Sequence, residues 1–369
     1  MAFNINPNTT QVKYPFNGHL NPNEVFGSIY NMILFQEVRY PDLVDNYGFV
    51  DMFKIEGSMF GDTALFYDQD VHTSRPWLGD AEAQNLLSVE RPDDPECQAV
   101  TLNKFRIIKT SLDSYLTKRA WSTADAFTSF NGIVRSLIGQ TKKLYETSLI
   151  NTYLGTVKGE AAKSLIEIPL SGITATGEEK NRLEAQTIAQ YIANLIVNLK
   201  DYSRDFNDYG FMRAYAEDQI MVIWNSAYVN KINKLDLPTI FNKAGLMDKF
   251  AQNILPDRFF GDMNSDSGTT GSDNKTVRAA VEKDFGSKHL FPGELLPNST
   301  AYGANETYTV DEDVICKVIS KDTIKYMAGF ETATEFWNPQ ALITSNMLIW
   351  GYADPARLKG EPCIVVHAD

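Results

Sequence analysis

The sequence predicts an α+β fold, and three stretches of the chain carry that prediction. A polar segment at about 57–110 has the pattern of a long hairpin, and a long amphipathic helix is predicted from Ser122 to about Leu154. A second amphipathic helix follows at about 178–200, and short apolar runs typical of strands recur in 313–366. Helices and strands therefore both occur, in separate stretches of the chain, as in α+β proteins.

The composition is that of an ordinary globular protein. Of 369 residues, 43% are hydrophobic and 22% are charged, which predicts two or three sub-domains. The net charge of −13 disfavours direct nucleic-acid binding, which needs a basic surface. The three widely spaced cysteines, Cys97, Cys316 and Cys363, predict folding in a reducing cytosol. No stretch has the pattern of a signal peptide or the apolar length of a membrane helix.

The N-terminal residues 1–56 are predicted to form an extended arm followed by a helix. Residues 1–20 are rich in Asn and Thr. Asn21, Pro22 and Glu24 then make a strong helix start, since they combine a cap, a proline at the first helical position and a capping box. The helix is expected to end before Pro41.

Segment 57–110 is predicted to be a two-stranded ribbon with strands at 64–67 and 105–108. Its long tip contains three prolines and eight acidic residues: Pro76, Pro92, Pro95, Asp68, Asp70, Asp80, Glu82, Glu90, Asp93, Asp94 and Glu96. A ribbon of two strands is only marginally stable in water, so we expect it to lie on its own domain or on a neighbouring subunit. The tip, 68–98, is expected to be mobile in an isolated subunit.

The helix predicted from Ser122 opens with a capping pattern at 121–125 and would run roughly 45 Å. We expect Leu137 on its buried face and Lys142 on the opposite face. The full buried face is Phe127, Phe130, Val134, Leu137, Ile138, Thr141, Leu144, Tyr145 and Ser148. The corresponding face of the second helix is Leu183, Ile188, Tyr191, Ile192, Leu195, Ile196 and Leu199.

The remaining segments alternate between strands and loops. A strand is predicted at 220–224, a short helix from Leu237, and a polar loop at 262–276. Strands resume at 313–319, continue through 342–350 and close at 363–366.

No catalytic, cofactor-binding or metal site is predicted. The sequence lacks a P-loop, GxGxxG, HExxH and GxSxG. The four histidines, at 19, 72, 289 and 367, are too far apart in sequence to form a typical zinc pattern. The acids of 262–276 resemble the start of a calcium loop, but Gly268 is one position late and no Glu closes the loop. The pair Asp93 and Asp94 is interpreted as solvated charge, because its surroundings are polar and broken by prolines.

The order of these segments resembles major capsid proteins with the HK97 fold, and most closely those of small podophages of the phi29 type. The most specific match is Ser203–Asn207 followed by Tyr215–Asp218. Weaker matches are dispersed along the chain: 21–26, 80–84, 103–105, 121–153, 321–322 and 338–340. Segment 262–312 is longer than in relatives of this type, an additional immunoglobulin-like domain is not expected, and nothing supports a Lys–Asn crosslink.

The resemblance implies an HK97-like arrangement of five segments. These are an N-terminal arm and helix at 1–56, an E-loop hairpin at 57–110, a P-domain with the spine helix at 111–165, an A-domain at 166–312 that includes the flexible loop 262–276, and closing P-domain strands at 313–369. The function implied is a structural one, as the major capsid protein of a tailed bacteriophage, without catalysis or cofactor.

Partners and location are implied by the same resemblance. Copies of the chain would form hexamers and pentamers of an icosahedral or prolate shell in the virion, assembled in the bacterial host cytoplasm. Scaffolding, portal and decoration or head-fibre proteins would bind this shell. It would enclose dsDNA without sequence-specific binding, and no membrane is involved. An arm, a ribbon and a long helix would lack stabilising contacts within a monomer. They therefore independently favour a shell of overlapping copies.

Two alternatives remain open from the sequence. One is an encapsulin-like nanocompartment shell with the same fold, and the other is a cytosolic α/β enzyme whose site has no recognised motif. The size of the assembled particle separates a shell from a monomeric or dimeric enzyme.

Overall fold

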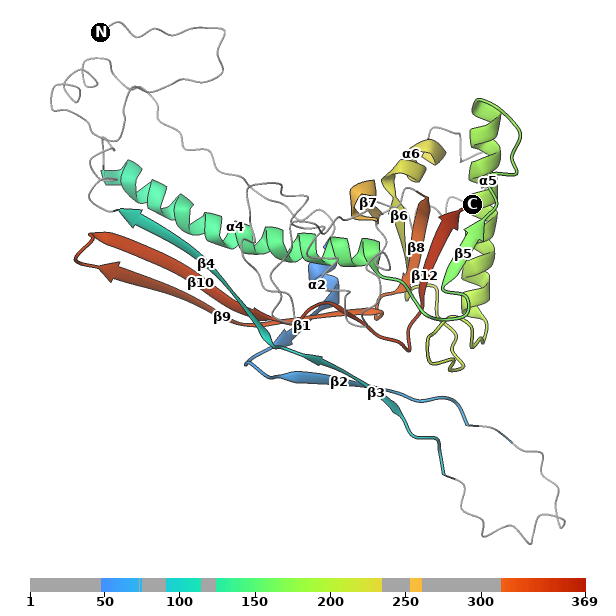
Figure 1. The fold of residues 1–369 in the computed structure, drawn as a ribbon, viewed down its shortest axis with the longest axis horizontal. Helices are drawn as coiled ribbons and strands as arrows, with labels where there is room; N and C mark the ends of the chain where they lie inside the picture. Colours follow the sequence, from blue (N-terminus) through green and yellow to red (C-terminus); the bar gives the residue numbers. More distant parts are fainter. Residues whose placement is uncertain (1–47, 73, 75–90, 114–123, 234–252, 261–312) are drawn as a thin grey trace, which may run out of the picture. The chain divides into compact units, whose positions relative to one another are not determined.

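The computed structural model describes residues 48–72, 74, 91–113, 124–233, 253–260 and 313–369 (Figure 1). The chain divides into two compact units, Met1–Val44 with Arg106–Lys143 and Glu331–Ile349, and Asp45–Phe105 with Leu144–Phe330 and Trp350–Asp369. We refer to these as unit 1 and unit 2. The predicted N-terminal arm and its helix, the helix from Leu237 and the loop 262–276 lie outside the described residues.

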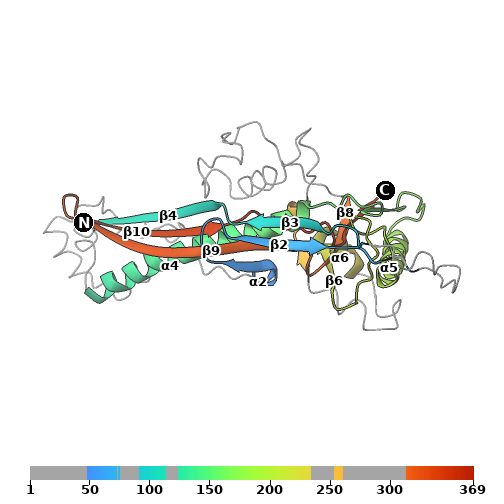
Figure 2. The same ribbon diagram turned by 90° about the horizontal axis from the view of Figure 1, so that it is seen from below.

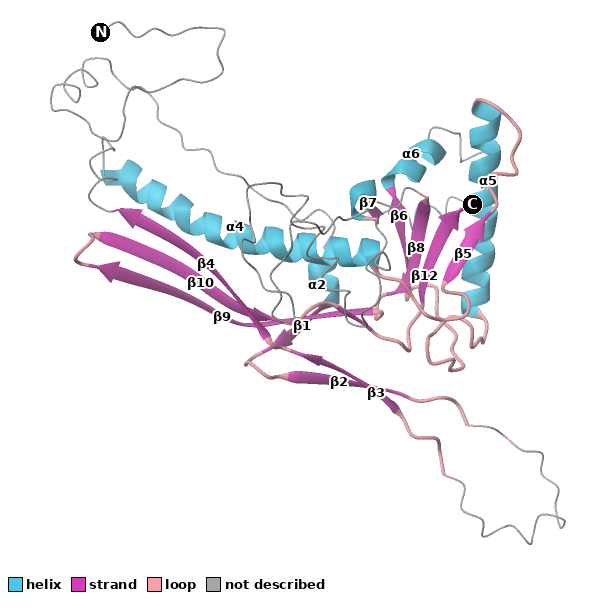
Figure 3. Ribbon diagram, in the orientation of Figure 1, coloured by secondary structure: helices cyan, strands magenta, loops and turns pink. Residues whose placement is uncertain are grey.

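Helix α4, Ala124–Thr156, is the long helix that the sequence predicts (Figure 3). Its 33 residues give a rod of about 50 Å. Three residues of the predicted buried face, Ile138, Tyr145 and Ser148, are buried, whereas Leu137 is only half-buried. Lys142, predicted to lie on the face opposite the buried one, makes an ion pair. Its Nζ lies 2.5 Å from Oε2 of Glu331, also in unit 1, and its side chain is 15% exposed.

Unit 2 is built around a five-stranded sheet with strand order β5-β12-β8-β6-β7. Strand β12 is parallel to β5 and antiparallel to β8, so the last strand in the sequence lies inside the sheet. Sequence patterns had predicted three of these strands at 220–224, 313–319 and 363–366. The bounds of all five are β5 Leu165–Ile168, β6 Ile220–Asn225, β7 Ile254–Leu255, β8 Val314–Ser320 and β12 Cys363–Ala368.

Helix α5, Glu178–Lys200, forms a hydrophobic core with this sheet, and its bounds confirm the prediction. Ile188 and Ile192 of the helix share that core with Val318 of β8. Acidic residues in the first turn and Lys200 in the last turn complement the helix dipole. Tyr191 departs from the predicted buried face, since it is 39% exposed. Two short helices complete this part of unit 2: α6 Ser226–Asn233 and η2 Asp257–Phe259.

A buried lysine lies among the apolar residues of β8. Lys317 is 1% exposed, and its Nζ donates a 2.7 Å hydrogen bond to the carbonyl oxygen of Val157, just beyond the end of α4. The carbonyls at the end of a helix have no partner within the helix and carry partial negative charge. The lysine therefore stabilises the end of α4 and ties it to the sheet. Cys363 lies beside this contact, and burial raises the pKa of its thiol. Burial also raises the pKa of the Cys316 thiol, which lies in the core shared with α5.

A second sheet has the strand order β1-β9-β10-β4, with β11 paired to β9. In unit 2, the fully buried Leu102 occupies a space that two glycines leave open. A Cβ atom at Gly57 of β1 would lie 2.8 Å from Leu102 Cδ1, and one at Gly351 of β10 would lie 2.8 Å from Leu102 Cδ2. Both glycines are therefore required by packing. The bounds here are α2 Phe49–Phe53, β1 Lys54–Gly57, β4 Lys104–Asp113, β9 Ile324–Asn338, β10 Ile343–Tyr352 and β11 Ala356–Arg357.

The predicted ribbon exists, but its strands pair differently from the prediction. Strand β2, Thr63–Asp68, pairs with β3, Glu96–Thr101, in an antiparallel ladder that joins Thr63 to Thr101 and Asp68 to Glu96. The two strands lie side by side in both views (Figure 1 and Figure 2). The strand expected at 105–108 belongs to β4, which neighbours β10 in the other sheet. The prediction missed β3 because its sequence is half polar and directly follows two prolines.

Candidate assembly site at the base of the hairpin

The loop after α5 is folded by the residues of the motif Ser203–Asn207. Ser203 and Arg213 exchange backbone hydrogen bonds of 3.0 and 3.1 Å, which close the loop. Within it, Asn207 is 1% exposed, accepts from the backbone N–H of Phe211 at 2.8 Å and donates to the Phe211 carbonyl at 2.7 Å. Gly210 supplies the left-handed conformation that the turn needs, with φ of 66°. The motif thus fixes a rigid loop, 203–213, on unit 2.

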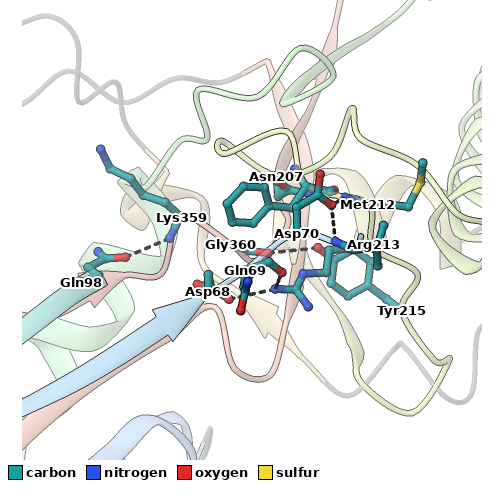
Figure 4. A network of polar contacts seen from close by, with 12 residues as sticks. Asp68, Gln69, Asp70, Gln98, Asn207, Met212, Arg213, Tyr215, Lys359 and Gly360 are labelled. Carbon is teal, nitrogen blue, oxygen red and sulfur yellow. Dashed lines mark hydrogen bonds and ion pairs between the residues drawn. The ribbon is translucent and has the colours of Figure 1, made fainter. Parts of the chain in front are cut away.

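This loop holds the end of the first hairpin strand through Asp70. The Oδ1 atom of Asp70 accepts hydrogen bonds from the backbone N–H groups of Met212 at 2.9 Å and of Val71 at 2.8 Å (Figure 4). Its Oδ2 atom pairs with the guanidinium of Arg204. The Met212 hydrogen bond, and then the Arg204 contact, lower the pKa of the Asp70 carboxyl, because both favour the ionised form.

Asp68 makes a second contact to the same loop. Its Oδ1 atom accepts from Nη2 of Arg213 at 3.1 Å (Figure 4). The carboxylate also lies against Gly360, where a Cβ atom would overlap it. Next to Gly360, burial raises the pKa of the Glu361 carboxyl, and the charges of Asp322 and Asp68 add to that effect. The close approach of Asp68 therefore depends on a residue without a side chain at 360.

The returning strand is held by a separate pair of hydrogen bonds. The side-chain amide of Gln98 donates to the carbonyl of Arg357 at 2.5 Å and accepts from the backbone N–H of Lys359 at 3.1 Å (Figure 4 shows the second). Arg357 in turn pairs with Asp208, and both side chains are at most 10% exposed. Burial is the largest effect and works against the charge of Arg357, but the hydrogen bond to Asp208 and the surrounding charge interactions together outweigh it, so the pKa of Arg357 is raised. Both strands of the hairpin are thus anchored on unit 2.

These contacts correct part of the prediction for 68–98. Asp68, Asp70 and Gln98 are hydrogen-bonded to their own chain, so the base of the tip is not free. The sequence left open whether the ribbon lies on its own domain or on a neighbouring subunit. The base of the tip lies on its own unit. Residues 73 and 75–90 of the tip lie outside the described residues.

Next to the anchoring residues, the hairpin exposes large apolar side chains. Leu65 and Tyr67 of β2 are 52% and 64% exposed, and Val71 is 58% exposed. Near the turn into the hairpin, the exposed ring of Phe60 stacks on Phe105 with centroids 5.2 Å apart. Apolar side chains exposed in a row on a two-stranded ribbon are typical of a surface that another protein covers.

Of the other residues considered from the sequence, the structure describes Asp93, Asp94, His72 and His367. Asp93 and Asp94 are both exposed, as expected for solvated charge. His72 is exposed, and His19 and His289, like the loop 262–276, lie outside the described residues. Across the part of the chain that the structure describes, no three His, Cys, Asp or Glu residues gather as a metal cluster would require. In that same part, no helix is long and apolar enough to cross a membrane.

Comparison with known proteins defines the fold. No protein-family model and no curated protein matches the chain. The capsid structure of Staphylococcus phage Andhra matches with a TM-score of 0.58 at 14% identity, over 98% of this chain and 96% of the other. A chain from the structure of the head fiber and inner core protein gp22 of native bacteriophage P68 matches with a TM-score of 0.58 at 14% identity, over 97% and 95%.

The chain has the HK97-like fold of phage capsid proteins. The motif Ser203–Asn207 begins the loop 203–213 that anchors the hairpin. The residues that carry the sequence resemblance therefore also have a structural role. The sequence did not reveal the partners of that loop, because Asp68 and Asp70 are about 140 residues away and look like two more acids in an acidic tip. A signal was present in retrospect, since arginines at 204 and 213 flank a loop in an otherwise acidic chain.

Proposed function

We propose that this protein is the major capsid protein of a tailed bacteriophage, and that its role is to build a shell rather than to catalyse a reaction. The observation that carries the proposal is the match to the capsid of Staphylococcus phage Andhra over 98% of the chain.

The exposed surfaces support assembly on physical grounds. The hairpin exposes Leu65 and Tyr67, and every residue from Glu331 to Trp337 on β9 is exposed, among them Phe336 at 60% and Trp337 at 46%. Aromatic residues contribute strongly to protein–protein interfaces, and exposed strands offer backbone groups for pairing. Such surfaces are costly in a monomer and useful where many copies overlap.

The finer assignments form part of the same proposal. The roles would be N-terminal arm for 1–56, E-loop for 57–110, P-domain for 111–165, A-domain for 166–312 and closing strands for 313–369. Strands of the last two segments share the sheet of β5, β12, β8, β6 and β7. We propose that the nearest relatives are podophage proteins of the phi29 type. The shell would be part of the virion, enclose dsDNA and assemble in the host cytoplasm from hexamers and pentamers. Scaffolding, portal and decoration or head-fibre proteins would be its partners.

Particle formation tests the proposal. The full chain is produced alone and together with a phage scaffolding protein, and the product is analysed by sedimentation and negative-stain microscopy. We expect closed particles tens of nanometres across, built through large and partly polar interfaces. A compact monomer or dimer under all of these conditions would refute the shell and return the enzyme alternative to consideration. Particles that contain a cargo enzyme instead of DNA during phage-free expression would favour a nanocompartment.

A further inference from the structure

The outward face of α5 carries no charge over about four turns. Between Glu184 and Lys200 the helix has 15 residues without a single Asp, Glu, Lys or Arg. At the 22% frequency of the whole chain, about three charged residues would be expected in such a stretch. Buried residues explain only one side of the helix, because Ala185, Ile188, Ile192, Leu195, Ile196 and Leu199 are those that pack into the core.

The exposed side is uncharged as well. Its exposed residues are Gln190, Tyr191, Asn194, Val197 and Asn198. At 100° per residue these five residues fall within one arc of about 120°, opposite the buried stripe, so they form one continuous surface. We call this surface the α5 outer face. Leu183 and Thr187 extend it by about two further turns toward the N-terminus, which gives a length of about 22 Å.

The composition of the α5 outer face is that of an interface and not of a solvated surface. Val197 is 64% exposed and Tyr191 is 39% exposed, while the three amides lie four residues apart along the helix. Depletion of charge combined with aromatic residues is characteristic of the buried centre of protein–protein interfaces. By contrast, charged residues cluster at both helix ends: Glu178, Glu179, Lys180, Arg182, Glu184 and Lys200.

The net charge of the chain indicates which protein would bind the α5 outer face. Each copy carries −13, so two copies repel one another unless they meet through surfaces without charge. A basic partner would instead be met by acidic side chains, which this face does not have. A second copy of this chain is therefore the partner whose chemistry the face fits.

We propose that the α5 outer face is the surface through which neighbouring copies of this chain contact one another within a ring of subunits. This inference rests on the proposed shell function and adds to it the specific surface. A ring requires a heterologous contact, so the face would meet a different patch on the next copy.

Accessibility of an introduced thiol tests the proposal. In a Cys97→Ser background, which removes the exposed native thiol and leaves the buried Cys316 and Cys363, an Asn194→Cys variant is labelled with a maleimide. We expect rapid labelling of free subunits and labelling at least tenfold slower in shells from which scaffolding protein has been extracted. The matched control is Asn181→Cys, an exposed asparagine about 140° round the same helix from Asn194, which should label at similar rates in both states.

A second variant measures the consequence for assembly. Asn194→Glu should leave the far-UV circular dichroism and melting temperature of free subunits unchanged, since it is an exposed site, and should reduce shell yield at least tenfold. Asn194→Gln should assemble normally. Shells in which Asn194→Cys labels as fast as in free subunits, or is protected only while scaffolding protein is present, would overturn this inference alone. Failure of every variant and of the unmodified chain to form shells would overturn the proposed function and this inference with it.

Discussion

The packing of Leu102 against Gly57 gives a quantitative test of the structure. Leu102 is fully buried, and replacing it with alanine should cost about 2–5 kcal/mol of unfolding free energy, because buried methyl groups are lost and a cavity remains. Gly57→Ala places a Cβ atom 2.8 Å from Leu102 Cδ1, closer than such contacts occur, and should cost about 1–3 kcal/mol by overpacking.

The double variant decides whether these two residues compete for one space. In the Leu102→Ala chain the methyl group added at residue 57 no longer meets Cδ1 and fills part of the cavity. The double variant should therefore be more stable than the two separate costs predict, by about 0.5–3 kcal/mol. Met327 lies 3.1 Å from the same Cβ position and keeps the compensation incomplete.

Urea unfolding of free subunits, followed by far-UV circular dichroism, supplies the four free energies of this cycle. Gly172→Ala is the control, because a Cβ atom there has nothing within 4 Å, and we expect a change below about 0.5 kcal/mol. Strict additivity of the two costs, or a Gly57→Ala chain that behaves like Gly172→Ala, would refute the packing described here.

Four further outcomes are expected. Ile138→Asp should lose about 2–5 kcal/mol of packing free energy and bury a charge, so free subunits of this variant should melt far below the parent protein. Its control is Lys143→Glu, at an exposed position of the same helix, which should melt like the parent. Normal melting of both variants would show that the α4 register is wrong. Gly360→Ala should displace the carboxylate beside it and make the hairpin of free subunits several-fold more sensitive to protease, whereas unchanged cleavage would contradict the anchoring. Because the pKa of Asp70 is lowered from 3.8, the docking it contributes should be intact above that pH and lost progressively as pH falls through the lowered pKa, visible as smaller amide protection factors in the hairpin at pH 3 than at pH 5 once the intrinsic pH dependence of exchange is divided out. A chelator should leave the melting temperature unchanged, since 262–276 lacks a complete calcium pattern, and a drop of several degrees would show a bound ion.

The elements that the sequence predicted well are those whose periodicity is local. Helix α5 was predicted with its observed bounds, and α4 and strand β6 were predicted to within two residues at the ends that the structure describes, because burial on one side repeats at a fixed step. The predicted face of α4 contained Ile138, which is buried, but also Leu137, which is half-buried, since both are apolar and only packing distinguishes them.

The elements that the sequence missed depend on distant partners. Strand β3 has little apolar content of its own, and its ladder with β2 is what makes it a strand. The pairing of Arg204 with Asp70 joins residues 134 positions apart, and neither residue type is unusual in its own segment. The burial of Lys317 was equally hidden, because a lysine in a strand normally reaches solvent and only the end of α4 explains why this one does not.

The position of β12 inside its sheet has a consequence for how a subunit is made. Strand β12 is hydrogen-bonded to β5 on one side and to β8 on the other, so the sheet stays divided until Cys363–Ala368 is inserted. The pairing with Leu165–Ile168 closes a loop of about 200 residues, which makes it slow to form. A chain interrupted before Cys363 cannot complete the core against which α5 packs, so a subunit gains the surface of that helix in its final position only after β12 has been inserted.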